Sequence, residues 1–255
     1  MNPAEESAMC EKHPYLSVVI PFYNEEESVE SVCAEVNGAL SCFNDLGWEL
    51  IMVDDGSSDD TARIIDRLSS TNRTFRALHL NPNSGQSAAL NAGFMAARGE
   101  IIATLDGDGQ NDPRDITILL EEMSRRGVHM MCGIRQKRSD GIVRRVSSRV
   151  ANRVRSAVLK DDITDIGCSM RVFRHECLTG VHLFRNSHRF FPTLVRMAGF
   201  SVSEMPVNHR ARRHGMSKYG GGINSRLWAG IVDLAGVYWM RKRAFSHTVT
   251  ERHEA

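Results

Sequence analysis

The chain has 255 residues, of which 42% are apolar and 25% are charged, with 32 Lys and Arg against 31 Asp and Glu. This composition excludes a disordered tail, a collagen-like chain and a small disulfide-stabilised domain, and it fits one large globular domain or two tightly joined ones. The charge is divided unevenly, because residues 1–134 hold nine basic and 22 acidic side chains whereas residues 135–255 hold 23 and nine. A basic half favours a phosphorylated or anionic partner, and an acidic half can hold a hard cation.

The start of the chain and its cysteines indicate a protein that stays in a reducing compartment. Residues 1–13 are polar and acidic and lack the basic start and apolar run of a signal peptide, so we expect no export, with residues 1–15 as a polar N-terminal segment. The six cysteines show neither a CxxC pair nor metal-ligand spacing. We expect reduced, mostly buried thiols and no zinc site at Cys10, Cys33, Cys42, Cys132, Cys168 and Cys177.

The first half of the chain alternates short apolar runs with stretches of helical periodicity. The apolar runs, rich in branched residues, predict five strands at residues 16–22, 48–53, 75–80, 101–105 and 128–133. Four amphipathic helices are expected between them, at residues 28–40, 61–68, 87–97 and 114–126. This strand–helix–strand order predicts an α/β fold with a mostly parallel sheet and helices on both faces.

Beyond residue 134 the sequence turns basic and less regular. In residues 142–159, valines recur every three or four positions, with five arginines and no acidic residue between them. This pattern predicts a basic amphipathic helix that either lies on an anionic membrane surface or covers the sheet.

A final helix is expected at residues 223–245, followed by a polar tail at 246–255. Its apolar stretch has 14 residues and contains Asp233, whereas a membrane-spanning helix needs about 20. We therefore expect an amphipathic helix that packs on the domain, on a partner or at a membrane surface. The residues suited to a headgroup layer are Trp228, Tyr238, Trp239, Arg241, Lys242 and Arg243.

In parallel α/β sheets, ligands bind beyond the carboxyl ends of the strands. Polar runs stand at that position after three of the predicted strands, at residues 21–25, 54–59 and 106–113. The chain has no GxGxxG after a strand and no GxxxxGK[ST], which argues against a dinucleotide oxidoreductase and a P-loop NTPase.

Asp106, Asp108 and Gln110 stand at alternating positions just past the fourth predicted strand. Two carboxylates and an amide oxygen aimed at one point suit Mg or Mn, held jointly with the oxygens of a diphosphate. The alternative is a simple turn, because Asp, Gly and Asn favour turns.

The ends of the first two strands offer candidates for binding a nucleoside. A carboxylate of Asp54 or Asp55 can accept hydrogen bonds from a base or ribose, although either residue can also cap a helix, as we expect of Ser58 and Asp59. Four residues on the same rim either wall a base pocket or only turn the chain into a helix: Pro21, Tyr23, Asn24 and Glu25.

Four motifs in fixed order resemble the family 2 glycosyltransferases. They read PFYNEEES, VDDGSSDDT, NSGQSAALNAGFMAARGE and DGDGQNDP, and the similarity extends from about residue 16 to residue 243. Within the family they look like the polyprenyl-phosphate branch, which includes dolichol-phosphate mannosyltransferase and bacterial undecaprenyl-phosphate sugar transferases. The resemblance implies a single GT-A nucleotide-diphospho-sugar transferase domain at residues 16–222. It also implies that the DxD-Q element holds the metal and that the PxYNE and DDGS elements surround the nucleoside.

Family members that act on sugar hydroxyls carry an ED base motif and often QxxRW, and this sequence has neither. Residues 187–191, where an ED motif would be expected, read SHRFF. A sugar hydroxyl needs a general base, whereas a lipid phosphate arrives ionised and needs positioning and charge screening. His188 would be the base in the rival interpretation, and a surface or capping histidine is the simpler one.

Basic residues at family motif positions are candidates for binding phosphate. The segment DIGCSMR, ending at Arg171, resembles the family's D-x-x-S-G-F-R segment. The alternative interpretation is that Arg171 forms an ordinary ion pair with Asp165. The segment RRHGMSKY resembles R-x-x-G-x-S-K-Y, so Arg212 and Lys218 would clamp charge on the leaving group. The resemblance assigns the acceptor phosphate to Arg135, Arg171, Ser217 and Lys218, whereas a solvated Arg135 and a generic basic loop are the alternatives.

These observations predict an inverting glycosyltransferase that moves a sugar from a nucleotide diphosphate to a polyprenyl phosphate, with Mg or Mn as cofactor. We expect a peripheral enzyme on the cytoplasmic face of the inner or plasma membrane, with a possible homo-oligomer and no nucleic-acid partner. The rivals are a family 2 transferase acting on a soluble saccharide and a catalytically silent nucleotide-sugar binding protein.

Overall fold

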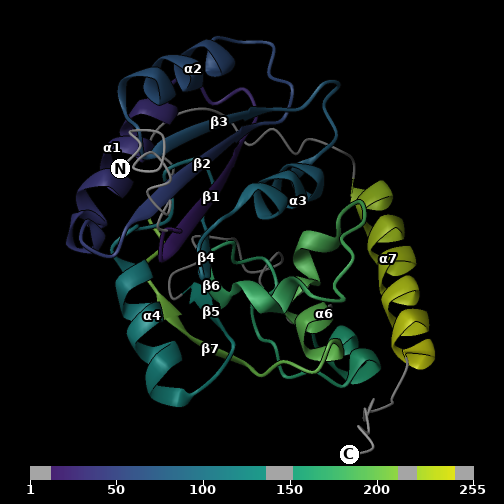
Figure 1. Cartoon of the computed structure of the whole chain (residues 1–255). Coiled ribbons are helices and arrows are strands. Elements are labelled where there is room, and N and C mark those ends of the chain that lie inside the picture. The colour runs from purple at the N-terminus through teal and green to yellow at the C-terminus, as the bar shows by residue number, and fades with distance from the viewer. Residues whose placement is uncertain (1–12, 136–151, 212–222, 245–255) are drawn as a thin grey trace, which may run out of the picture.

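The computed structural model describes residues 13–135, 152–211 and 223–244. They form one α/β domain around a seven-stranded sheet with the strand order β3-β2-β1-β4-β6-β5-β7 (Figure 1). The strands are β1 (Leu16–Phe22), β2 (Trp48–Asp54), β3 (Phe75–His79), β4 (Ile101–Thr104), β5 (Met130–Arg135), β6 (Arg171–Arg174) and β7 (Val202–Val207). The helices are α1 (Val29–Ala39), α2 (Thr61–Thr71), α3 (Gln86–Ala96), α4 (Asp115–Arg126), α6 (Phe191–Met197) and α7 (Ile223–Arg243).

Strand direction follows from the pairing of neighbours. β1 is parallel to β2 and β4, β2 is parallel to β3, and β5 is parallel to β7. β6 is antiparallel to both of its neighbours, β4 and β5. Six of the seven strands therefore run in one direction, and their carboxyl ends meet at the same edge as the amino end of β6.

Helices cover both faces of the sheet, as the sequence predicts. On one face, apolar residues of α1, α2 and α4 pack against alternate β1 residues such as Leu16, Val18 and Ile20. On the other face, α3 and α6 pack against Val19 and Ile51. The central strands are buried on both sides, because parallel strands in such a fold are covered by helices on each face.

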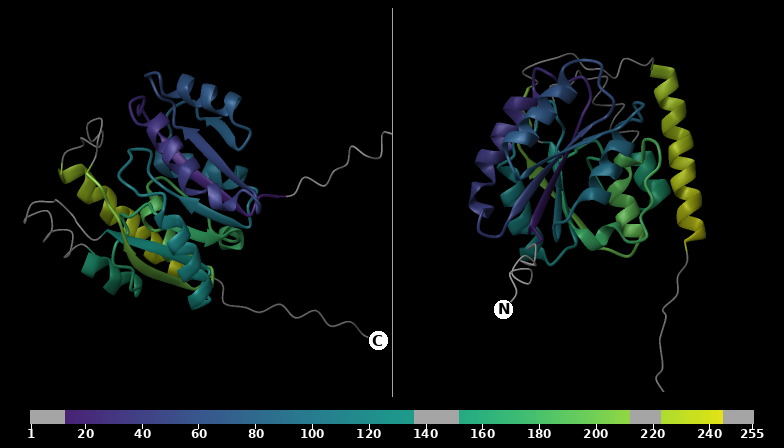
Figure 2. Two further views of the ribbon diagram at one scale, coloured as in Figure 1. Left: turned by 90° about the vertical axis from the view of Figure 1, so that its left-hand side faces the viewer. Right: turned by 45° about the horizontal axis from the view of Figure 1, so that its top comes forward.

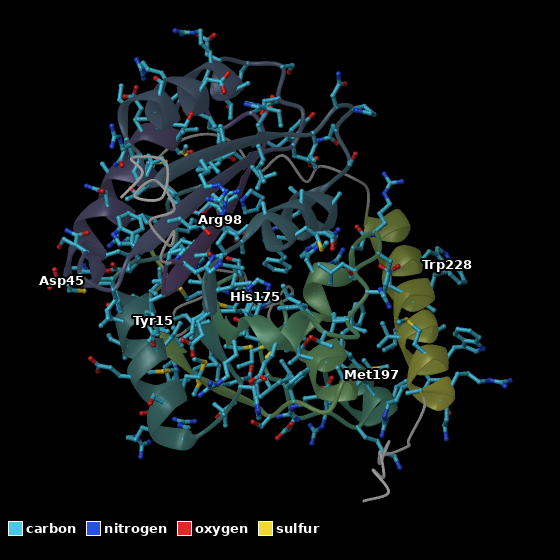
Figure 3. All side chains as sticks on the ribbon, viewed as in Figure 1. Tyr15, Asp45, Arg98, His175, Met197 and Trp228 are labelled. Carbon is cyan, nitrogen blue, oxygen red and sulfur yellow. The ribbon has the colours of Figure 1, made fainter. Side chains whose placement is uncertain are left out.

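The helix α7 lies along the side of the domain that carries α6, in both views of Figure 2. Its inner face packs through Leu234, Val237 and Met240 against Leu159 and Leu194. Its outer face carries Trp228, which is 68% exposed and points away from the domain (Figure 3). No helix among the described residues is long and apolar enough to cross a bilayer.

The structure confirms all five predicted strands and the first four helices within a few residues, but two strands were missed. β6 and β7 lie in the region that the sequence shows only as irregular. Of the basic helix expected at 142–159, the structure describes residues 152–159, which are helical. Of the five described cysteines, Cys42 is exposed and the others are buried thiols: Cys33, Cys132, Cys168 and Cys177.

Candidate active site

The candidate site lies at the sheet edge where the strands end. Thr104, the last residue of β4, pairs with Arg171, the first residue of β6. Because β6 runs opposite to its neighbours, its amino end meets the carboxyl ends of β4 and β5. This topology brings the segment before Arg171 and the end of β5 at Arg135 next to the residues that follow β4.

The residues after β4 form a compact loop around Asp106. The side chain of Gln86, at the start of α3, donates a hydrogen bond from Nε2 to Asp106 Oδ1 at 2.9 Å. The backbone N–H of Gln110 donates to Asp108 Oδ1 at 3.1 Å, so the loop folds back on its own carboxylate. The loop is tied to α1 by Ser28, whose hydroxyl donates to the carbonyl of Gly107 at 2.7 Å.

Gly107 allows the loop to approach β1 closely. A Cβ atom at this position would stand 2.4 Å from the Phe22 ring and 2.9 Å from the Pro21 carbonyl oxygen. Neither distance is compatible with a methyl group, so the site requires glycine between its two aspartates.

The surroundings of Asp106 disfavour its ionised form when no cation is bound. Burial of the carboxyl group, followed by repulsion from Asp108, raises the pKa of Asp106 to about 6. The Ser169 hydroxyl and the charges of Arg135 and Arg171 oppose this rise. A half-buried carboxylate beside a second one, with an amide side chain two residues on, is a donor set that fits a hard divalent cation. No group of three His, Cys, Asp or Glu side chains that could hold a metal ion is found among the described residues.

Asp54 and Asp55 are both buried at the end of β2, and both accept hydrogen bonds from the backbone. The N–H of Ser57 donates to Asp54 Oδ1 at 3.1 Å. Asp55 accepts from the N–H groups of Ser84 and Gly85 at 2.9 Å and holds the loop that precedes α3.

The rim after β1 is held by the loop that leads into α2. Asn24 has a positive φ of 52°, and its Oδ1 accepts a hydrogen bond from the N–H of Ser58 at 2.7 Å. The N–H of Glu25 donates to Thr61 Oγ1 at 2.8 Å. Pro21 belongs to β1, and Tyr23 is 41% exposed at the rim. The rim residues therefore lie on the side of the sheet edge that α1 and α2 cover. The N-cap residue of α2 is Asp60, whose side chain makes no capping hydrogen bond, so the prediction that Ser58 or Asp59 caps this helix was wrong. Asp59 Oδ1 accepts from the N–H of Thr61, and Ser58 bonds to Asn24.

The two predicted phosphate-binding arginines of the sheet both lie near Asp106, since each lowers its pKa. Arg135 pairs with Asp165 through two hydrogen bonds of 2.7 and 2.8 Å and is largely buried, so it is not a solvated charge. Arg171 is buried and donates to the carbonyls of His188 and Ile166. The expected alternative of an Arg171–Asp165 pair does not form, because Arg135 occupies that carboxylate.

Arg210, which precedes the remaining candidates in the sequence, lies at this same edge. After β7, the N–H of Arg210 donates to the Gln110 carbonyl at 2.8 Å, and Gln110 Nε2 donates back to the Arg210 carbonyl at 3.1 Å. Asn111 and His209 form a β-bridge beside this pair. The predicted residues Arg212, Ser217 and Lys218 lie outside the described residues, which end before this gap at Ala211.

His188 occupies the position where an ED motif was expected. Its Nδ1 lies 2.8 Å from Ser87 Oγ, and its backbone N–H donates to the same oxygen at 3.1 Å. Burial, followed by the charges of Arg171 and Arg189, lowers the pKa of His188 to about 3. The imidazole is therefore neutral at physiological pH and joins α3 to the segment that contacts Arg171.

Sequence reasoning missed Gln86, Ser169 and Arg210. Gln86 and Ser169 lie within two of the family motifs given above, and their place in those motifs is the signal that could have identified them. Arg210 precedes a recognised motif, but its contact with Gln110 depends on β7, which was not predicted.

With this geometry in place, comparison with known proteins identifies the class. Residues 17–181 match the sequence profile described as glycosyl transferase family 2. The chain is 39% identical over 236 residues to a dodecaprenyl-phosphate galacturonate synthase of Rhizobium johnstonii, covering 90% of this chain and 68% of the relative. It is 34% identical over 205 residues to an undecaprenyl-phosphate 4-deoxy-4-formamido-L-arabinose transferase of Pseudomonas fluorescens, covering 80% and 60%. The chain thus spans 60 to 68% of the length of these relatives.

Solved structures share the fold at lower sequence identity. A mannosyltransferase from Pyrobaculum calidifontis in complex with GDP-Man and Mn²⁺ superposes with a TM-score of 0.63 at 18% identity, over 93% of this chain and 66% of that one. A glucosyl-3-phosphoglycerate synthase from Mycobacterium tuberculosis in complex with Mn²⁺, UDP and phosphoglyceric acid gives 0.65 at 22% identity, over 88% and 79%.

The parallel sheet, its single reversed strand and the carboxylates after β4 define a GT-A fold. The chain belongs to the family 2 glycosyltransferases.

Proposed function

We propose that this protein transfers a sugar, with inversion, from a nucleotide diphosphate to a polyprenyl phosphate. The observation that carries the proposal is the meeting of the carboxylates after β4 with Arg135 and Arg171 at one sheet edge. Such an arrangement suits a reaction between two phosphate-bearing substrates. The two relatives named above, which act on dodecaprenyl and undecaprenyl phosphate, support the same acceptor class.

The donor diphosphate would lie over the loop after β4. Asp106, Asp108 and Gln110 would hold Mg²⁺ or Mn²⁺ there, which offsets the charge of the leaving nucleoside diphosphate when bound. The nucleoside would lie toward the rim on the α1/α2 side, formed by Pro21, Tyr23, Asn24, Glu25, Asp54 and Asp55.

The acceptor phosphate would approach from the β5/β6 side. An ionised phosphate oxygen is already a nucleophile, so the site needs cations that position it rather than a base. Arg135, Arg171, Ser217 and Lys218 would bind this phosphate. Arg212 and Lys218 would stabilise charge on the leaving group.

His188 does not suit the role of a base in the rival mechanism. Its Nδ1 is engaged with Ser87, and its pKa of about 3 leaves it a weak proton acceptor at neutral pH. This observation favours a lipid phosphate acceptor over a sugar hydroxyl.

The helix α7 would rest on the cytoplasmic surface of the inner or plasma membrane. One face packs on the domain through the buried Val237, whereas the opposite face exposes Trp228, Val232 and Trp239, of which Trp239 lies near the basic end of the helix. Exposed tryptophans beside cationic side chains fit a headgroup layer with anionic lipids.

Transfer to a lipid tests the proposal directly. The full chain, Mn²⁺ and a panel of labelled nucleotide sugars should give organic-soluble label with short-chain polyprenyl phosphate, and none with the corresponding polyprenol, which lacks the phosphate. Label on a soluble saccharide alone would favour the rival transferase. Donor binding without transfer to any acceptor would favour a catalytically silent protein.

A further inference from the structure

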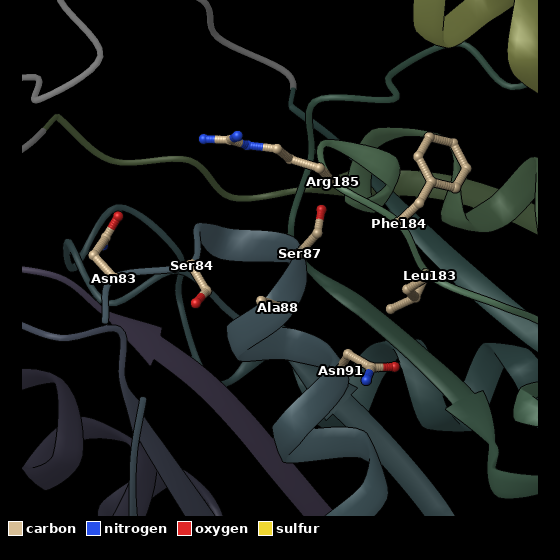
Figure 4. Close-up of a pocket in the computed structure, with 8 residues that line it drawn as sticks. All are labelled: Asn83, Ser84, Ser87, Ala88, Asn91, Leu183, Phe184 and Arg185. Atoms are coloured by element: carbon tan, nitrogen blue, oxygen red, sulfur yellow. The ribbon is translucent and has the colours of Figure 1, made fainter. Parts of the chain in front are cut away.

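A cavity of about 400 Å³ lies beside the first turns of α3, facing the segment before η3 (Ser187–Arg189). It is large enough for a monosaccharide, since ligand sites commonly begin near 300 Å³. Figure 4 shows the α3 side chains on one wall and Arg185 reaching over them from the other. The lining residues are Asn83, Ser84, Ser87, Ala88, Asn91, Leu183, Phe184 and Arg185.

The cavity adjoins the predicted metal site. Gln86 bonds to Asp106, and the next residue, Ser87, lines the cavity. His188 makes a second link between the cavity and the predicted site. Its side chain contacts Ser87, and its carbonyl accepts a hydrogen bond from Arg171. A group attached to a diphosphate at Asp106 therefore has a short path into this cavity.

Part of the proposed nucleoside rim lies toward α2 and part of it adjoins the cavity, because Asp55 bonds to Asn83 and Ser84, which line the cavity. Asn24 and Glu25 are bonded to the segment that begins α2, which covers one face. The cavity is bounded by α3, which covers the other face. In a nucleotide sugar the diphosphate separates the nucleoside from the sugar. A nucleoside held at Asn24 and Glu25, with its diphosphate at Asp106, would therefore leave the cavity beside α3 to the sugar.

The walls combine groups that bind hydroxyls with one cation. Serine hydroxyls and asparagine amides bond the hydroxyl groups of a sugar, and Leu183 and Phe184 offer an apolar surface. No Asp or Glu stands among the described residues that line the cavity. Among the described residues, Arg185 has no ion-pair partner, so its guanidinium is available to an anion from solution or from a substrate.

We propose that this cavity holds the sugar of the donor and that Arg185 makes the enzyme prefer a sugar bearing a carboxylate, a uronic acid. The proposal rests on the proposed function, because it takes the donor to be a nucleotide sugar. The anion that Arg185 binds has two possible sources, a sugar carboxylate or the phosphate of the lipid acceptor, and the experiment must separate them.

The test compares matched donors that differ only in the C6 group, UDP-galacturonate with UDP-galactose and GDP-mannuronate with GDP-mannose. Dissociation constants are measured on the full chain with Mn²⁺ and no acceptor, so the result does not require transfer. With the donor base that the protein accepts, the acidic donor should bind at least about tenfold more tightly than the neutral one. Arg185→Gln should reduce this ratio to near one.

Two further variants sharpen the comparison. Asn91→Asp places a carboxylate in the cavity at constant side-chain size and should lower the affinity for the acidic donor more than for the neutral one. Arg174→Gln removes an exposed arginine that does not line the cavity and should leave the ratio unchanged.

Three results would overturn the proposal. Wild-type protein could bind both donors equally, or Arg185→Gln could retain the wild-type preference. In transfer assays, Arg185→Gln could raise KM only for polyprenyl phosphate, which would assign the guanidinium to the acceptor. Failure of transfer to any acceptor, with the acidic preference intact, would reject the proposed function and leave the sugar pocket standing.

Discussion

Arg210 contacts two carboxylates from different parts of the fold. Its guanidinium lies 2.7 Å from Asp112, at the end of the loop after β4, and 2.5 Å from Glu35 on α1. Its backbone is bonded to Gln110 at the same time. This arrangement fixes Arg210, which precedes Arg212 by two residues in the sequence, relative to the predicted metal ligands.

Replacing Arg210 should impair catalysis more than stability. Arg210→Met is expected to lower kcat about tenfold or more, because small displacements of positioned groups are costly to rate. Arg114→Met is the matched control, since Arg114 pairs with the same Asp112 carboxylate but is mostly exposed. It should change kcat less than about twofold. Equal effects of the two variants on kcat, or a loss of kcat that only tracks Tm, would contradict this role.

Removing one carboxylate of the predicted metal pair should abolish transfer without unfolding the protein. Asp108→Ala is expected to reduce transfer by at least about 100-fold and to weaken Mn²⁺ binding. Circular dichroism checks the fold, and Asp45→Ala supplies a control at an exposed aspartate far from the loop. Turnover of Asp108→Ala at the wild-type rate would defeat the metal assignment.

His188 should make the stability of the protein sensitive to acid. The folded state lowers the pKa of His188 to about 3, below the value of about 6.5 in an unfolded chain. Between these values the unfolded state binds more protons, so the free energy of unfolding decreases as the pH falls below about 6.5.

His188→Asn removes this titration. Its Tm deficit relative to wild type should therefore shrink between about pH 7.5 and about pH 5. His182→Asn, at an exposed histidine, should follow the wild-type profile. Parallel Tm profiles of wild type and His188→Asn would show that His188 titrates normally in the folded protein.

Two glycines should respond to alanine with opposite signs. Gly107→Ala is expected to destabilise the protein by about 1–3 kcal/mol, because the new methyl group would overlap Phe22. Gly38→Ala, in α1 with no atom within 4 Å of the new Cβ, should stabilise it by up to about 1 kcal/mol. Urea denaturation of both variants measures the two effects, and a neutral Gly107→Ala would mean that the loop can move away from β1.

The exposed face of α7 should govern attachment to vesicles. Trp228→Ser with Trp239→Ser is expected to reduce co-flotation with anionic vesicles severalfold, because two interfacial aromatic side chains are lost. Met95→Ser, at an 80% exposed residue of α3, is the control. Unchanged flotation together with a loss of self-association would assign this face to a contact between copies of the chain.

Much of the fold could be predicted because its first half follows simple periodicities. β1 to β5 are apolar runs separated by amphipathic helices, and the carboxylates after β4 stand where such sheets bind ligands. β6 has four residues with an arginine at each end, which no periodicity separates from a loop. β7 contains Pro206, which argues against a strand, but β7 lies at the edge of the sheet, where proline is tolerated.

The carboxylates of the candidate site were predictable because they follow strands that the sequence revealed, whereas Arg171 begins the missed strand β6 and was found through its motif. Asp106 and Asp108 follow β4 directly, and the structure brings Arg135 and Arg171 near Asp106. The contact of Gln86 with Asp106 depends on α3 crossing beneath β1 and β2. No sequence pattern gives that tertiary arrangement.

The insertion of β6 between β4 and β5 sets an order for assembly. Among the described strands, β5 pairs with β6 and β7 alone, so the β5–β7 pair joins the rest of the sheet through residues 171–174. The nascent chain must therefore be synthesised beyond residue 174 before β6 can pair with β4 and cover its exposed edge. A truncation just short of that point would expose an unpaired strand and invite aggregation.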